Sequence, residues 1–223
     1  VVDVCKSLNE NFNVKIRLVS IISVRKFWKN RKIIKSWYPD AVIMPMIPKL
    51  KYWRFNIISM FFIAIIFRPK TAICRNSIPT VLSLKLKNAG IIKKVIYDGR
   101  GLEYEQIKEY GIVNDSLLAN DILLSEKRAV LFSDFQLSIS DKLLQYWKDN
   151  YNYDRTTYSI IPCTLTSNSI TSLHDGLRKE FGFEKEDIII AYAGSSAGWQ
   201  SFSLMLDFFT NQLKSNDKIK ILL

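Results

Sequence analysis

The chain has 223 residues, 48 % of them apolar, which predicts a sizeable core and excludes a disordered chain. Its net charge is +11, and all of the excess lies in residues 1–110, with 21 basic against 7 acidic side chains. Three widely spaced cysteines (Cys5, Cys74 and Cys163), without a CxxC pair or a histidine cluster, indicate reduced thiols and exclude a disulfide framework and a zinc site.

Strand-like and helix-like segments alternate along residues 1–70. We expect a helix over residues 2–11, a strand over 14–20, a basic helix over 23–37 that ends before Pro39, and a strand over 41–46. Residues 50–67 predict one long apolar helix with a basic start, ended by Pro69.

The same alternation continues to the end of the chain. We expect strands over residues 71–75, 94–98, 135–139, 158–161, 187–193 and 218–223. Helices are expected over 79–89, 116–132, from the Ser140 cap to about 149, over 173–181 and over 202–213. Strands alternating with helices are typical of α/β folds with doubly wound parallel sheets.

The ends of the sequence lie inside such patterns. Residue 1 is not Met and opens within an amphipathic run, and residues 218–223 read as an apolar strand, which seldom ends a domain. We therefore expect a fragment at both ends.

The apolar segment of residues 50–67 allows two interpretations. Its basic start suits a helix that lies on an anionic bilayer surface. A helix that is apolar nearly all round also suits the interior of a domain. The uninterrupted apolar run, IISMFFIAIIF, is too short to span a membrane.

Ligands of parallel α/β sheets bind beyond the carboxyl ends of the strands, which selects four places. These are residues 74–77, residues 98–101, Ser140, and residues 194–200. The sequence GSSAGWQ at 194–200 is the most informative, because a short Gly/Ser loop before a helix suits a phosphate. It lacks a Walker motif, and a simple tight connection is the alternative.

Charged residues mark two of the other places. Arg100 suits a phosphate or carboxylate, and Asp98 suits a sugar hydroxyl or a role as a base. An ion pair between Asp98 and Arg100 within a turn is the structural alternative, and Arg75 has a similar double interpretation. The single histidine, His174, lies in a polar helix start, and we expect no catalytic role for it.

Four stretches in order resemble the retaining GT-B glycosyltransferases of the large family-four type, common in bacterial surface polysaccharide synthesis. They are TAICRNSIPTVLSLKLKNAGIIKKVIYDGRGLEYEQ, SEKRAVLFSDFQLSISDKLLQYW, YSIIPCTLTSN and LRKEFGFEKEDIIIAYAGSSAGWQ. The resemblance covers nearly the whole chain.

The resemblance implies two Rossmann-like domains. Residues 1–163 would form the acceptor domain without its first strand, residues 164–172 a linker, and residues 173–223 the start of the donor domain. Transfer would move a sugar from a nucleoside-diphosphate sugar to a hydroxyl of a glycan or lipid-linked acceptor, with no cofactor and no metal. The protein would be cytoplasmic, with peripheral contact to the inner face of an anionic plasma membrane.

Site residues follow from the same resemblance. Donor contacts would come from Gly194, Ser195, Ser196, Gly198, Trp199 and Gln200. Arg75, Asp98 and Arg100 would line the acceptor side, with Asp98 as the only candidate for catalysis. The family's Gly-rich first loop, its acceptor-domain histidine and its acidic pair in the donor domain have no counterpart here.

Two alternatives remain open at this point. One is a basic, non-catalytic module that binds anionic lipid or nucleic acid, although no RNA- or DNA-reading signature is present and we expect no nucleic-acid partner. The other is a GT-B relative that epimerises a sugar nucleotide.

Overall fold

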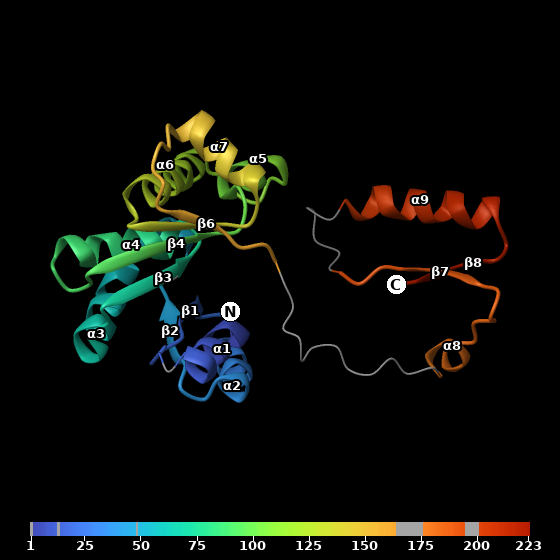
Figure 1. Cartoon of the computed structure of the whole chain (residues 1–223), viewed down its shortest axis with the longest axis horizontal. Helices are drawn as coiled ribbons and strands as arrows, with labels where there is room; N and C mark the ends of the chain where they lie inside the picture. The colour runs from blue at the N-terminus through green and yellow to red at the C-terminus, as the bar shows by residue number, and fades with distance from the viewer. Residues whose placement is uncertain (1, 13, 48, 164–175, 195–200) are drawn as a thin grey trace. The chain divides into compact units, whose positions relative to one another are not determined.

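A computed structural model describes residues 2–12, 14–47, 49–163, 176–194 and 201–223 (Figure 1). The chain divides into two compact units, residues 1–164 and residues 165–223.

The first unit begins with two helix–strand segments, which a helical region follows. Its elements are α1 (Val2–Phe12), β1 (Val19–Ser23), α2 (Phe27–Trp37), β2 (Val42–Met46), the 3₁₀ helix η1 (Leu50–Asn56) and α3 (Ile57–Phe67). Strands β1 and β2 pair in parallel, with Val19 opposite Val42. Buried Cys5 of α1 and Ile43 of β2, together with Ile22 and Ile34, form a small core around this pair.

A four-stranded parallel sheet follows, in the order β3-β4-β5-β6. Its elements are β3 (Thr71–Arg75), α4 (Ser77–Asn88), β4 (Lys94–Gly99), α5 (Glu103–Glu109), α6 (Ser116–Phe132), β5 (Phe135–Ser138), α7 (Asp141–Tyr151) and β6 (Tyr158–Ile160). Because all three neighbouring pairs are parallel, the carboxyl ends of the four strands lie at one edge.

Helices cover one face of this sheet. Tyr97 of β4 packs with Val130 of α6 and with Leu144 and Trp147 of α7. Val95, two residues earlier and on the same face, packs in a second cluster with residues of α3, β3 and α4. On the opposite face the side chains are less buried, and Ile73 of β3 is 55 % exposed.

Local signals in the sequence explain where these helices begin and end. The Ser140 hydroxyl accepts a hydrogen bond from the Leu143 N–H and caps α7, as predicted. The Asp115 carboxylate accepts from the amides of Leu117 and Leu118 and caps α6. Gly90 follows α4 at φ +75°, a conformation that glycine adopts without the strain of a Cβ.

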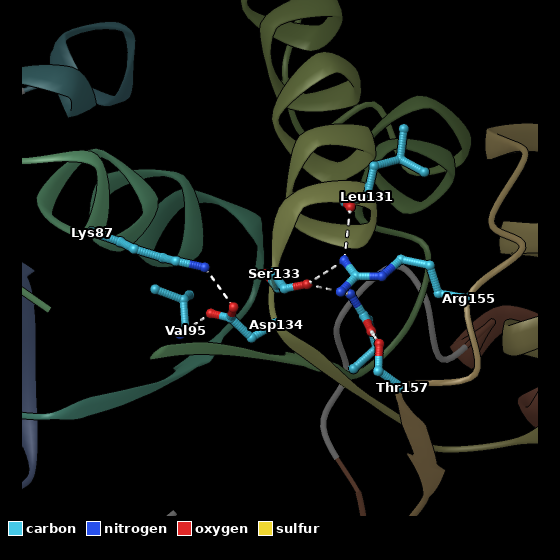
Figure 2. Close-up of polar contacts among 8 residues, drawn as sticks. Lys87, Val95, Leu131, Ser133, Asp134, Arg155 and Thr157 are labelled. Carbon is cyan, nitrogen blue, oxygen red and sulfur yellow. Dashed lines mark hydrogen bonds and ion pairs between the residues drawn. The ribbon is translucent and has the colours of Figure 1, made fainter. Parts of the chain in front are cut away.

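Polar contacts tie the elements together at the amino ends of β4 and β5 (Figure 2). Asp134 accepts a hydrogen bond from the Val95 N–H at 2.8 Å and pairs with Lys87 of α4. Arg155 donates to the carbonyl oxygens of Leu131 and Ser133 at the end of α6. These contacts hold together the sheet edge opposite the carboxyl ends.

The second unit contains one β-α-β segment. Its described elements are α8 (Leu177–Glu180), β7 (Ile188–Ala191), α9 (Phe202–Ser215) and β8 (Ile219–Leu222). Strands β7 and β8 pair in parallel with Ile188 opposite Ile219, and α9 connects them. Phe209 of α9 is buried, whereas Leu204 and Phe208 are exposed.

The expected α/β class with parallel sheets is confirmed, while two Rossmann-like domains, the second of them incomplete, remain a prediction. One predicted strand was wrong in its bounds. The strand expected over residues 14–20 begins at Val19, because side chains already satisfy the backbone of Ile16: its N–H donates to Asn9 Oδ1, and its carbonyl accepts from the Tyr38 hydroxyl.

The helix expected over residues 50–67 is present with these bounds, but it is not a regular α-helix throughout. Its first seven residues form η1, in which Trp53 and Asn56 are buried. Asn56 Oδ1 accepts from the Ile47 N–H, and Asn56 Nδ2 donates to the Trp53 carbonyl. The interpretation of the segment as a buried interior helix is wrong, because Ala64 is the buried residue of α3.

Candidate functional site

The carboxyl ends of β3 to β6 bring four loops to one edge of the sheet. We call this region the carboxyl edge and define it as residues 75–77, 98–101, 138–140 and 161–163. Three of the predicted places (residues 74–77, residues 98–101 and Ser140) lie here, and Arg75 is the register partner of Asp98. Side chains of register partners on parallel strands point to the same face of the sheet.

Arg75 ends β3 with an exposed side chain. Among the described residues, its guanidinium has no hydrogen-bond or ion-pair partner. A guanidinium carries a permanent positive charge and donates paired hydrogen bonds that match phosphate and carboxylate groups. Arg75 is therefore the cation at this edge that is available to an anionic ligand.

Asp98 and Arg100 pair with each other. The Arg100 Nε atom lies 2.9 Å from Asp98 Oδ1, although the N–H does not point at the oxygen well enough to form a hydrogen bond. Within the described part of the chain, Asp98 Oδ2 has no partner. The alternative of an ion pair within the turn is thus realised, and the pair still offers one carboxylate oxygen for a hydroxyl group.

Gly99 separates these two residues and lies against an aromatic side chain. A Cβ atom at this position would lie 2.6 Å from Cζ2 and 2.7 Å from Cη2 of Trp147, which is fully buried in α7. Only glycine allows β4 to end this close to the indole ring. The packing of α7 therefore positions the Asp98–Arg100 turn.

A carboxylate occupies the N-terminus of α4, directly after Arg75. Glu103 of α5 accepts hydrogen bonds from the Ser77 N–H at 2.6 Å and from the Ser77 hydroxyl at 2.8 Å. Burial raises the pKa of Glu103, and the hydrogen bonds from Ser77 oppose that shift. Because Glu103 already accepts these donors, an anion at the carboxyl edge must rely on the arginines.

A second carboxylate, Glu126 of α6, supports α5 in the same way. It is fully buried and accepts a hydrogen bond from the Tyr104 N–H at 3.0 Å. Burial first, and the nearby Glu103 carboxylate second, raise the pKa of Glu126 to about 7, although the hydrogen bond from the Tyr104 N–H opposes the shift. The chain of contacts from Glu126 through α5 and Glu103 to Ser77 fixes the α4 N-terminus beside Arg75.

Sequence reasoning did not identify Glu103, Glu126 or Trp147 as parts of this region. No helix was predicted over residues 103–109, where α5 forms. Glutamates in the first turn of a helix are a known signal for an N-terminus, and that signal was available here.

The donor-side prediction falls mostly outside the described residues. Gly194 is described and exposed, and a Cβ there would lie 2.5 Å from the Tyr192 hydroxyl oxygen. Ser195, Ser196, Gly198, Trp199 and Gln200 lie outside the described residues, as does His174. The expected diphosphate loop therefore remains a prediction from the sequence.

In the described ranges, no group of three or more His, Cys, Asp and Glu side chains is placed to hold a metal ion. In comparisons with known proteins, no family model matches the chain. A search of curated proteins also finds no match. What the site does must therefore be argued from its own geometry and from the sequence.

Proposed function

We propose that the chain is part of a glycosyltransferase of the GT-B type that uses a nucleoside-diphosphate sugar. The carbon–oxygen bond from the sugar to the diphosphate breaks, and a bond from the same carbon to an acceptor hydroxyl oxygen forms. The proton of that hydroxyl leaves with the nucleoside diphosphate or to solvent. The acceptor is a glycan or a lipid-linked sugar.

One observation supports the proposal most. The exposed guanidinium of Arg75 lies at the carboxyl edge of a parallel sheet, in register with the Asp98–Arg100 pair. Ligands of such sheets bind at this edge, and the available groups suit a phosphorylated, hydroxyl-rich molecule. Four stretches of the sequence also resemble family-four transferases in the same order, and this resemblance is what suggests sugar transfer as the reaction.

In this proposal the groups have separate roles. Arg75 and Arg100 supply positive charge on the acceptor side, and Asp98 Oδ2 accepts a hydrogen bond from a hydroxyl. The loop at residues 194–200 binds the donor diphosphate through backbone N–H groups. Charge stabilisation by fixed donors is the largest expected contribution to such a transfer.

Saturation-transfer NMR with a panel of UDP-, GDP-, ADP- and CMP-sugars tests the proposal on the full chain. We expect signal transfer for at least one compound of the panel. With a sugar phosphate as the probe of the acceptor side, we expect Arg75→Ala to reduce the affinity at least tenfold. Arg128→Ala is the matched control, because Arg128 is exposed on α6, away from the carboxyl edge. Binding of no sugar nucleotide, or equal effects of both variants, would count against the proposal.

The products distinguish transfer from epimerisation. Incubation with the bound sugar nucleotide and an acceptor sugar should release a nucleoside diphosphate if the chain supports transfer. An epimerase would instead convert the sugar nucleotide without that release.

We further propose that α3 rests on an anionic membrane surface at the cytoplasmic face. The outer side of α3 exposes Ile58, Phe61, Phe62, Ile65, Ile66 and Phe67. Exposed basic residues flank the patch: Lys49, Lys51, Arg68 and Lys70. Apolar side chains bordered by cations suit insertion at the headgroup level of anionic lipids.

The anchoring of η1 favours surface contact over a span. Among the described residues, the helical segment 50–67 is long and apolar enough to cross a bilayer. The regular α-helix has 11 residues, about 16 Å, against roughly 30 Å of hydrocarbon. Trp53 is buried and donates to Asp121 of α6 at 2.9 Å, which keeps η1 in the folded unit.

Vesicle co-sedimentation tests this contact. We expect binding to vesicles that contain anionic lipid, weak binding to zwitterionic vesicles, and loss of binding as salt is raised. The double variant Phe62→Ser, Ile66→Ser should bind at least tenfold more weakly. Leu117→Ser, at an 80 % exposed site of α6, should bind like the unmodified chain. Equal loss in both variants would contradict a specific role for α3.

A further inference from the structure

Two helices at the carboxyl edge, α4 and α5, begin with carboxylates from elsewhere in the chain. The side chains of the residues that directly precede them form no capping hydrogen bond. Instead, Glu126 of α6 accepts from the Tyr104 N–H in the first turn of α5. Glu103 of α5 accepts in turn from the Ser77 N–H at the start of α4. We call these two consecutive contacts the carboxylate relay, since each satisfies N–H groups that a helix start leaves free.

The Glu126 end of the relay is buried and only half satisfied. Its Oε2 atom accepts from the Tyr104 N–H, whereas its Oε1 atom has no hydrogen-bond partner among the described residues. A protonated carboxyl can carry its proton on one oxygen while the other still accepts a hydrogen bond. The neutral acid therefore keeps the contact with α5, but the ionised form leaves a buried charge without enough donors.

The surroundings of Glu126 supply no cation to balance such a charge. In the described part of the chain, Glu103, Glu105 and Glu126 form no ion pair. Burial raises the pKa of the nearby tyrosines of β4 and α7, so they stay neutral near pH 7: Tyr97, Tyr146 and Tyr151. Ionisation of Glu126 thus adds a negative charge beside carboxylates, and a proton is the counter-ion that fits.

We propose that the carboxylate relay is a proton-dependent switch: α5 packs on α6 while Glu126 is protonated and leaves it when Glu126 ionises, which withdraws Glu103 from Ser77. With seven residues, α5 is too short to persist as a helix without this packing. Glu126 has a pKa of about 7 in the packed state, against 4.5 for an ordinary glutamate. Between these pH values the equilibrium shifts toward release by up to about 300-fold.

The switch acts on the carboxyl edge through two contacts of α5. Glu103 holds Ser77, two residues after Arg75. The Gln106 side chain lies against Gly101, where a Cβ would be 2.7 Å from Gln106 Nε2. Release of α5 removes both contacts, so the edge has the arrangement described above only in the protonated state. That the switch thereby regulates acceptor binding is the one part that rests on the proposed transferase function.

A pH titration of the ¹⁵N-labelled full chain without ligand tests the switch. We expect the amide shifts of Tyr104 and Ser77 to share a midpoint above pH 4.5, although these amides contact different carboxylates. Glu126→Gln should remove that midpoint from Ser77, because glutamine accepts from the Tyr104 N–H without ionising. Glu109→Gln, at an exposed position of the same helix, is the matched control and should leave the midpoint unchanged.

Two results would overturn the proposal: no shared midpoint, or a Ser77 midpoint that persists in Glu126→Gln. Glu103→Gln covers the case in which Glu126→Gln does not fold. Because the Glu103 carboxylate adds to the effect of burial on the pKa of Glu126, its removal should move the Tyr104 midpoint toward 4.5. A Tyr104 midpoint that does not move contradicts the relay. No ligand is present, so these outcomes are independent of whether the chain binds a sugar nucleotide.

Discussion

At Gly99, the space for a side chain is already filled by the indole of Trp147, with 2.6 Å between a built Cβ and Cζ2. We expect Gly99→Ala to lower the free energy of unfolding by about 2 kcal/mol, because overpacking forces the ring or strand to shift. Urea denaturation followed by tryptophan fluorescence measures the loss. Gly176→Ala is the control, since nothing lies within 4 Å of a Cβ there. Equal stability of both variants would contradict this packing.

Glu126 gives a pH dependence of known sign. The pKa of Glu126 is about 7 in the folded chain, whereas an ordinary glutamate, as in the unfolded chain, has a pKa of 4.5. Between these two pH values the folded state therefore binds more protons than the unfolded state. The contribution of Glu126 therefore lowers stability as pH rises from about 4.5 to 7, by on the order of 3 kcal/mol. Below pH 4.5 this effect is absent.

Glu126→Gln tests that sign. A glutamine still offers an oxygen to the Tyr104 N–H but carries no charge, so the variant should be more stable than the unmodified chain at pH 8. Its melting temperature should also change less between pH 4.5 and 8. Glu109→Gln, at an exposed position of α5, should leave the profile unchanged. A Glu126→Gln profile parallel to that of the unmodified chain would show that the buried carboxyl does not titrate in this range.

At the scale of elements, Asp134 joins α4, β4 and β5 (Figure 2). Burial alone would raise the pKa of Asp134, but the hydrogen bonds from Lys87 and from the Val95 N–H outweigh it and lower the pKa. A carboxyl with a lowered pKa stabilises the fold above its unfolded value and loses that effect as pH falls through the folded value.

Asp134→Asn should therefore cost about 1 kcal/mol at pH 7, and the cost should shrink at acid pH. Chemical denaturation at pH 7 and pH 3 measures both numbers. Asp154→Asn, at an exposed position before β6, serves as the control. A loss for Asp134→Asn that is the same at both pH values would show that the charge is not what joins these elements.

Elements were predictable where local rules and packing agree. Residues 71–75 and 116–132 match β3 and α6 at both ends, because branched residues mark the strand and Asp115 caps the helix. Residues 14–18 alternate like a strand, yet the Asn9 and Tyr38 side chains satisfy the backbone of Ile16 instead of a neighbouring strand. The alternation of apolar and polar residues cannot predict hydrogen bonds between side chains and backbone that are distant in the sequence.

At the scale of the whole molecule, the rule that ligands bind beyond the carboxyl ends of strands located Arg75, Asp98 and Arg100 from the sequence. That rule does not supply sheet register, so the pairing of Arg75 with Asp98 needed the structure. Glu103 was missed for a similar reason, because its role depends on the approach of α5 to the start of α4. The donor loop lies outside the described residues and remains a prediction.

The central claim is that the carboxyl edge of the four-stranded sheet binds the acceptor of a sugar transfer. Titration of the ¹⁵N-labelled chain with a sugar phosphate as the probe of the acceptor side, followed by amide chemical shifts, tests it most directly. We predict that within the first unit the largest shifts fall on residues 75–77, 98–101 and 138–140. Shifts concentrated instead at the opposite edge, around residues 93–95 and 134, or no shifts in the first unit, would contradict the account.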